Sequence, residues 1–224
     1  MSIDSSPEAP PQIEYPESDG LPMADNDVQY EWIVTIKGGL DVVFGDRPDV
    51  YVVGNLFWYP VEGDNKTCMA PDVLVAFGRP KAGRRGSYLQ WIEGGIAPQV
   101  VFEIIRSPSN RLAEMIRKHQ FYQRFGVEEY YLYDPDNLEL LGWLRDGEEL
   151  REIPEMAGWV SPRLGIQFQI GDDLRILGPD GRPFATYLEL SRQRDESTRR
   201  AEESARRAER LAAKLRELGI DPDE

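Results

Sequence analysis

The stretch from residue 70 to residue 122 contains two apolar runs, APDVLVAF (70–77) and QVVFEII (99–105), followed by LAEMIRKHQFY (112–122). The first two runs have the aliphatic and aromatic composition of buried strands, and the third spaces its apolar residues along one helix face. Each strand run carries one carboxylate, Asp72 or Glu103. A carboxylate in a buried strand must be desolvated, and this is costly unless a cation or hydrogen bonds compensate.

Two carboxylates on neighbouring strands with a lysine nearby form a minimal Mg²⁺ site for hydrolysing a phosphodiester. Many metal-dependent nucleases place that lysine two residues after the second acid, on the same strand face. Ile105 occupies this position here. The next helix offers a replacement, because Glu114, Lys118 and Tyr122 follow at four-residue intervals on one face. We therefore expect Lys118 to reach back to the carboxylates and Tyr122 to pack or donate a hydrogen bond.

Each of these residues, taken singly, also has a structural interpretation. Asp72 follows a proline and could cap a turn. Glu114 and Lys118 have the spacing of an ordinary exposed ion pair. Glu103 is the hardest to explain in this way, because large apolar residues flank it on both sides in a core strand.

The net charge of −14 is distributed unevenly along the chain. Residues 1–31 contain eight acids and no Lys or Arg, whereas residues 79–124 contain nine bases against three acids. Clustered bases are what contact with phosphate requires, although a solvated helix face beside a basic loop has the same composition. We expect six bases to hold a DNA backbone without reading its sequence: Arg79, Lys81, Arg84, Arg85, Arg106 and Arg111.

Composition divides the chain into three parts. Residues 1–26 are rich in Pro, Ser and acids, which is typical of a disordered tail. Residues 27–183 alternate strand and helix patterns, which predicts an α/β domain with a mixed central sheet flanked by helices. Its expected strands include 50–59, 70–77, 99–105 and 129–133. Residues 184–224 are predicted to be a charged helical tail from Tyr187 onward, with a weak coiled-coil seam that offers a route to a homo-oligomer.

Composition also bears on the cellular setting. The chain has no apolar run near the roughly 20 residues of a membrane span, and no basic and apolar leader follows Met1. Cys68 is the single cysteine, which excludes an internal disulfide. We therefore expect a cytoplasmic protein without a membrane partner. The single histidine, His119, is expected to lie at the surface.

In combination these motifs resemble the Uma2 family of bacterial endonucleases, members of the PD-(D/E)XK superfamily with the restriction-endonuclease-like fold. The resemblance covers roughly residues 30–180. It rests on residues 70–75, 98–104, 107–110, 114–115, 118, 122, 126–131 and 134–135.

In that family the superfamily lysine is thought to have moved to the helix, which matches Lys118 here. The resemblance implies Asp72 and Glu103 as ligands of Mg²⁺ or Mn²⁺, the Ile104 carbonyl as a third ligand, and Lys118 as the charge-stabilising group. The superfamily often adds an acid from the first helix, and Glu31 is the positional candidate.

One departure from the family pattern concerns the start of the Lys118 helix. Family members usually place two residues between the strand glutamate and Ser-Pro, whereas this chain has three, Ile104, Ile105 and Arg106. The extra residue shifts the helix relative to the strand. Two function classes therefore stay open: a metal-dependent endonuclease acting on DNA, and a catalytically inactive nuclease-fold protein acting as an interaction or oligomerisation module. No Gly-x-Ser-x-Gly motif or His/Cys constellation supports a small-molecule hydrolase.

Overall fold

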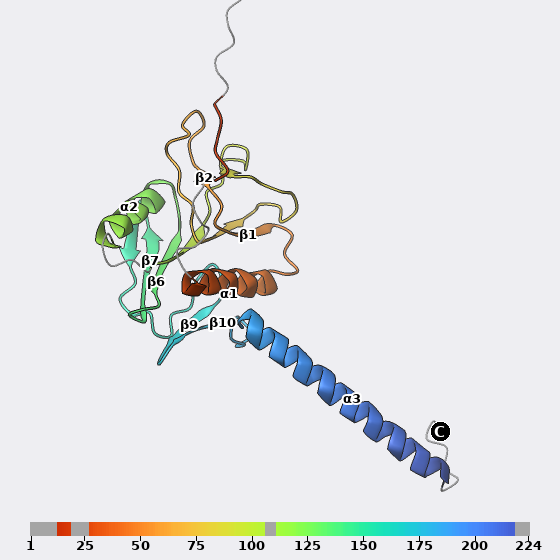
Figure 1. Ribbon diagram of the computed structural model, residues 1–224. Helices are drawn as coiled ribbons and strands as arrows, with labels where there is room; N and C mark the ends of the chain where they lie inside the picture. The colour runs from red at the N-terminus through yellow and green to blue at the C-terminus, as the bar shows by residue number, and fades with distance from the viewer. Residues whose placement is uncertain (1–12, 19–26, 106–110, 218–224) are drawn as a thin grey trace, which may run out of the picture. The chain divides into compact units, whose positions relative to one another are not determined.

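A computed structural model describes residues 13–18, 27–105 and 111–217 of the chain (Figure 1). The chain divides into two compact units, Met1–Phe184 and Ala185–Glu224. The first unit contains a six-stranded sheet in the order β1-β3-β5-β6-β7-β8. The pairing of β5 with β6 is parallel and the other four pairings are antiparallel. The predicted α/β architecture with a mixed central sheet is therefore confirmed.

The elements have the following bounds. The central sheet consists of β1 (Val50–Gly54), β3 (Val73–Phe77), β5 (Val100–Ile104), β6 (Glu129–Asp134), β7 (Glu139–Asp146) and β8 (Glu149–Glu152). Two further strand pairs are β2 (Trp58–Tyr59) with β4 (Tyr88–Leu89), and β9 (Gln167–Ile170) with β10 (Leu174–Leu177). The helices are α1 (Asp27–Val43), α2 (Arg111–Arg124) and α3 (Tyr187–Glu217).

Two hydrophobic cores lie on opposite faces of the sheet, because successive side chains of a strand point to opposite sides. In β5, Phe102 and Ile104 belong to the core that contains the buried residues of α1. Val101 and Ile105 belong to the other core, which contains Tyr122 of α2. Glu103 alternates with Ile104 and therefore points toward the α2 side.

The predicted strand 50–59 is divided into β1 and β2. Asn55 lies between them with φ of 50°, in the left-handed region, and an extended strand cannot pass through that conformation. The Asn55 amide N–H donates to the Asp72 carbonyl at 3.2 Å. The break therefore also fixes the chain just before β3.

Residues 13–18 lie within the range predicted to be a disordered tail, yet they pack against other residues of the first unit. The ring of Tyr15 contacts the rings of Tyr59 and Trp91, with centroid separations of 5.2 and 5.0 Å. The Tyr59 hydroxyl donates to the Pro16 carbonyl at 2.8 Å. The aromatic contacts of Tyr15 hold the segment in place although its composition is largely polar. The rest of the predicted tail, 1–12 and 19–26, lies outside the described residues.

The second unit contains α3, a helix of 31 residues, where a charged helix was predicted. Leu190 and Leu211, two residues of the predicted seam, are 52% and 55% exposed. Among the described parts of the chain, none of the helices combines the length and the apolar composition that crossing a bilayer requires.

Candidate functional site

The register of β3 against β5 brings the two predicted acids together. Val73 of β3 pairs with Phe102 of β5 in an antiparallel ladder, so one step further along Asp72 lies opposite Glu103. Residues opposite each other in such a ladder project on the same face. Asp72 is only 5% exposed and Glu103 only 1%. Two carboxylates are thus buried side by side at the end of β5.

Helix α2 supplies two partners for Glu103. The Lys118 ammonium lies 2.8 Å from Glu103 Oε2, and the Tyr122 hydroxyl donates to Glu103 Oε1. Lys118 also pairs with Glu114 at 3.1 Å. The three helical residues are four apart and share one face. Lys118 therefore reaches back from the helix to Glu103, as its spacing predicted.

Asp72 is held from two other directions. The backbone N–H of Ile104 donates to Asp72 Oδ2 at 2.7 Å. The side-chain amide of Gln29, in the first turn of α1, lies with Nε2 3.3 Å from each Asp72 carboxylate oxygen. The same Nε2 is 3.2 Å from the Ile104 carbonyl oxygen. Gln29 thus connects the carboxylate to the backbone carbonyl that was predicted as a third metal ligand.

The electrostatics of the site differ between the carboxylate and the ammonium. Burial and the nearby charge of Glu103 raise the pKa of Asp72 to about 7, although Lys118 and the hydrogen bonds from Ile104 and Gln29 oppose this. Burial alone would lower the pKa of Lys118, but the charges of Glu103 and Asp72 outweigh it and raise that pKa above its ordinary value. Burial also raises the pKa of Tyr122 well above normal. Lys118 therefore stays an ammonium and Tyr122 stays a hydrogen-bond donor at neutral pH.

The first helix contributes a different residue from the one predicted. Glu31 is solvent-exposed, whereas Gln29 contacts Asp72 and Ile104. Residues two positions apart in an α-helix are rotated by about 200° around its axis. The side chains of Gln29 and Glu31 therefore point to nearly opposite sides of α1. Gln29 is not among the sequence-predicted residues, because the family resemblance implies an acid from the first helix. The available signal was a polar residue in the first turn of an amphipathic helix.

Most of the predicted DNA-contacting bases in the loop after β3 have partners within the fold. Arg79 and Arg85 both pair with Glu93, at 2.9 and 2.6 Å, and Glu93 is itself buried. Arg85 also lies 4.0 Å from the centroid of the Tyr51 ring. A buried carboxylate needs such cations, so both arginines serve the fold.

The remaining predicted bases differ in their surroundings. The Lys81 ammonium donates to the Phe44 carbonyl at 3.1 Å, while Arg84 is exposed. Arg106 lies outside the described residues, and for Arg111 the description covers the backbone alone. His119, expected at the surface, is half-buried with its ring 5.5 Å from that of Trp143.

The chemistry of the donor set fits a hard divalent cation. Asp72 and Glu103 offer carboxylate oxygens, and the Ile104 carbonyl offers a third oxygen beside Asp72. Oxygen ligands of this kind are the ones that Mg²⁺ takes in proteins. The described residues contain no group of three or more His, Cys, Asp or Glu side chains that could hold a metal ion by themselves. A site here would therefore depend on the backbone oxygen as well as the two acids.

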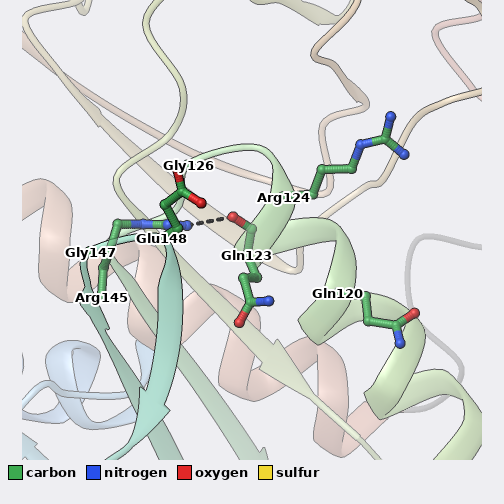
Figure 2. A pocket seen from close by; sticks show the side chains of 7 residues that line it. All are labelled: Gln120, Gln123, Arg124, Gly126, Arg145, Gly147 and Glu148. Atoms are coloured by element: carbon green, nitrogen blue, oxygen red, sulfur yellow. Dashed lines mark hydrogen bonds between the residues drawn. The ribbon is translucent and has the colours of Figure 1, made fainter.

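A separate hollow of about 430 Å³ lies at the C-terminal end of α2 (Figure 2). Its lining consists of Gln120, Gln123, Arg124, Gly126, Arg145, Gly147 and Glu148. The Arg145 guanidinium donates to the carbonyls of Val127 and Gln123, both at 2.7 Å. Arg145 therefore caps the end of the helix, and the hollow contains none of the acids described above.

Comparison with known proteins gives one family assignment. The model of the Uma2 family, described as "Putative restriction endonuclease", matches residues 25–174. Curated proteins gave no match. Among solved structures, the chain is similar to a crystal structure of "a putative nuclease belonging to DUF820" from Anabaena variabilis ATCC 29413. That similarity has 18% sequence identity, covers 61% of this chain and 72% of the other, and has a TM-score of 0.45.

Proposed function

Because this chain belongs to the Uma2 family, as its motifs indicated, we propose that it is a metal-dependent endonuclease that hydrolyses phosphodiester bonds of DNA. The observation that carries the proposal is the burial of Asp72, the residue before β3, beside Glu103 of β5, with the Lys118 ammonium 2.8 Å from Glu103. A structural role alone does not require two buried acids at adjacent positions, since each raises the cost of ionising the other.

In this proposal Asp72, Glu103 and the Ile104 carbonyl would hold Mg²⁺ or Mn²⁺. When bound, the cation would supply a water of lowered pKa and neutralise charge on the scissile phosphate. Tyr122 holds one oxygen of Glu103, which leaves the orientation of that carboxylate fixed. Such support from neighbouring groups is typical of metal ligands in proteins.

Lys118 would stabilise the negative charge that develops on the phosphate or on the attacking oxygen. Its raised pKa keeps it protonated, so we assign it charge stabilisation and not proton abstraction. Glu114 pairs with the same ammonium and would position it. Among the loop bases, Arg84 is exposed and would contact the DNA backbone, a contact that positions the substrate without reading its sequence.

The test is cleavage of supercoiled plasmid by the full chain with Mg²⁺ or Mn²⁺, compared with Asp72→Ala, Glu103→Gln and Lys118→Ala. We expect each variant to lose activity by roughly 100-fold or more, because each loses a metal ligand or the charge-stabilising group. Circular dichroism checks that each variant folds.

Glu129→Gln is the matched control for Glu103→Gln. Glu129 is a buried glutamate on the adjacent strand β6, and it accepts hydrogen bonds from Tyr131 and Ser161 on the face toward α1. We expect this variant to keep most of the cleavage activity. Equal activity in all the proteins would point to a contaminating nuclease, and absence of both cleavage and metal binding would favour the non-catalytic interaction module.

A further inference from the structure

Gln29 places a single nitrogen atom among three oxygens of the candidate site. Its Nε2 is 3.3 Å from both carboxylate oxygens of Asp72 and 3.2 Å from the Ile104 carbonyl oxygen. The amide nitrogen is therefore nearly equidistant from the three acceptors. Asp72 and Ile104 are also two of the three groups that the proposed function assigns to the metal.

A metal ion bound to these oxygens and this amide group would compete for the same space and the same lone pairs. Mg²⁺ requires oxygen ligands at about 2.0–2.1 Å, so an ion held by Asp72 and the Ile104 carbonyl would lie where the amide hydrogens now point. The N–H groups present the positive end of the amide dipole to the oxygens, and a cation satisfies the same acceptors. The amide therefore stabilises the partial and full negative charges of these oxygens, more weakly than a cation would.

We propose that Gln29 competes with the divalent cation: its amide satisfies Asp72 and the Ile104 carbonyl in the metal-free protein, and the cation enters by displacing it. This inference rests on the proposed metal site. In this proposal α1 lowers the metal affinity of the site, because its Gln29 side chain is a neutral donor that competes with the cation. One neutral donor thus bridges the Asp72 carboxylate and the Ile104 carbonyl.

Removing the amide should have opposite effects on the free protein and on metal binding. The metal-free protein loses hydrogen bonds to a buried carboxylate and a carbonyl, so it should become less stable. The cation no longer has to displace a donor, so its affinity should rise. If Gln29 were only a structural spacer, stability would fall with no gain in affinity. If its own oxygen ligated the cation, affinity would fall.

The experiment is a calorimetric titration of the full chain with MnCl₂ and with MgCl₂, for wild type, Gln29→Ala and Gln29→Met. Methionine keeps approximately the side-chain length but has no N–H donor. We expect both variants to bind Mn²⁺ about tenfold more tightly than wild type, the effect of releasing one hydrogen bond to a charged acceptor. In EDTA, their melting temperatures should be lower by roughly 2–4 °C. Glu31→Gln is the matched control, since it lies exposed on the same helix and should change neither quantity.

Weaker or unchanged metal affinity in both Gln29 variants would overturn this inference. In that case, metal binding and plasmid cleavage by the wild type would still support the proposed function. If neither the wild type nor any variant bound a divalent cation, both the inference and the metal-dependent function would be wrong. The melting temperatures in EDTA would then report only the structural contribution of the Gln29 hydrogen bonds.

Discussion

Burial of Asp72 lowers the stability of the fold at neutral pH, and the same buried carboxylate is a proposed metal ligand. Burial and the charge of Glu103 raise its pKa to about 7 from an ordinary value of 3.8. The folded protein therefore holds a proton on Asp72 up to a much higher pH than an ordinary aspartate would. A cation bound to the carboxylate would have the opposite effect, because it stabilises the ionised form. The energetic cost of the site in the free protein is thus the basis of its proposed affinity for metal.

At the scale of this residue we predict a specific pH dependence of stability. Between about pH 4 and pH 7 the folded chain binds a proton at Asp72 that the unfolded chain has released. Stability should therefore fall as pH rises through this window. The interval between the two pKa values corresponds to roughly 4 kcal/mol. In urea unfolding with EDTA at pH 5, 6, 7 and 8, Asp72→Asn should show a flatter dependence than wild type.

The difference between the two proteins isolates Asp72 from other groups that titrate. Burial also raises the pKa of Glu129, which contributes a slope of the same sign, but this contribution is common to wild type and variant. Parallel stability curves for the two proteins would contradict the assignment. Addition of Mg²⁺ at pH 8 should stabilise the wild type and not Asp72→Asn, because only the wild type retains both acidic ligands.

At the scale of elements, two adjacent arginines in the loop between β3 and β4 have different surroundings. Arg85 is half-buried against Glu93 and the Tyr51 ring, whereas Arg84, the preceding residue, is exposed. Burial raises the pKa of Glu93, but Arg85 and Arg79 outweigh it and the net pKa is lowered. The ion pairs of Arg79 and Arg85 with Glu93 therefore hold the loop in place. From composition alone, the same arginines suggest a phosphate-binding patch.

Substitution of these adjacent arginines should separate folding from DNA binding. We expect Arg85→Ala to lower the free energy of unfolding by about 2–3 kcal/mol, because Glu93 stays buried with one cation fewer. Arg84→Ala should leave stability within about 0.5 kcal/mol while weakening DNA binding and reducing its salt dependence. Urea unfolding and fluorescence anisotropy with a labelled duplex measure the two effects. Equal stability losses would contradict this division of roles.

At the scale of the whole molecule, the chain combines a sheet-centred unit with a helix that forms its own compact unit. Ser197, Ala201, Ser204 and Ala208 occupy the middle seam positions of α3, and the side chains of this stretch are exposed. Long leucines lie only toward the ends, among them Leu190 and Leu211. A seam of this composition buries little apolar area and can support only weak pairing.

We predict weak self-association of the full chain through α3. Sedimentation velocity should show a concentration-dependent increase in apparent mass at roughly 10–100 µM, because the seam offers few large apolar residues. The double variant Leu190→Glu, Leu211→Glu should remain monomeric over that range, since charges at seam positions oppose pairing. Identical sedimentation of the two proteins would show that this seam does not pair.

The sequence by itself determined the strand and helix character of the segments around the site. It also predicted that Asp72, Glu103, Lys118 and Tyr122 would lie together, because acids within apolar runs and polar residues at four-residue spacing are local patterns. It could not determine that Gln29 takes the position expected of Glu31, or that Glu93 pairs with two of the loop arginines. Those outcomes depend on which helix face meets the sheet and on how a loop folds back. Contacts between residues far apart in the chain arise only when packing and burial select one arrangement, and that selection belongs to the tertiary structure.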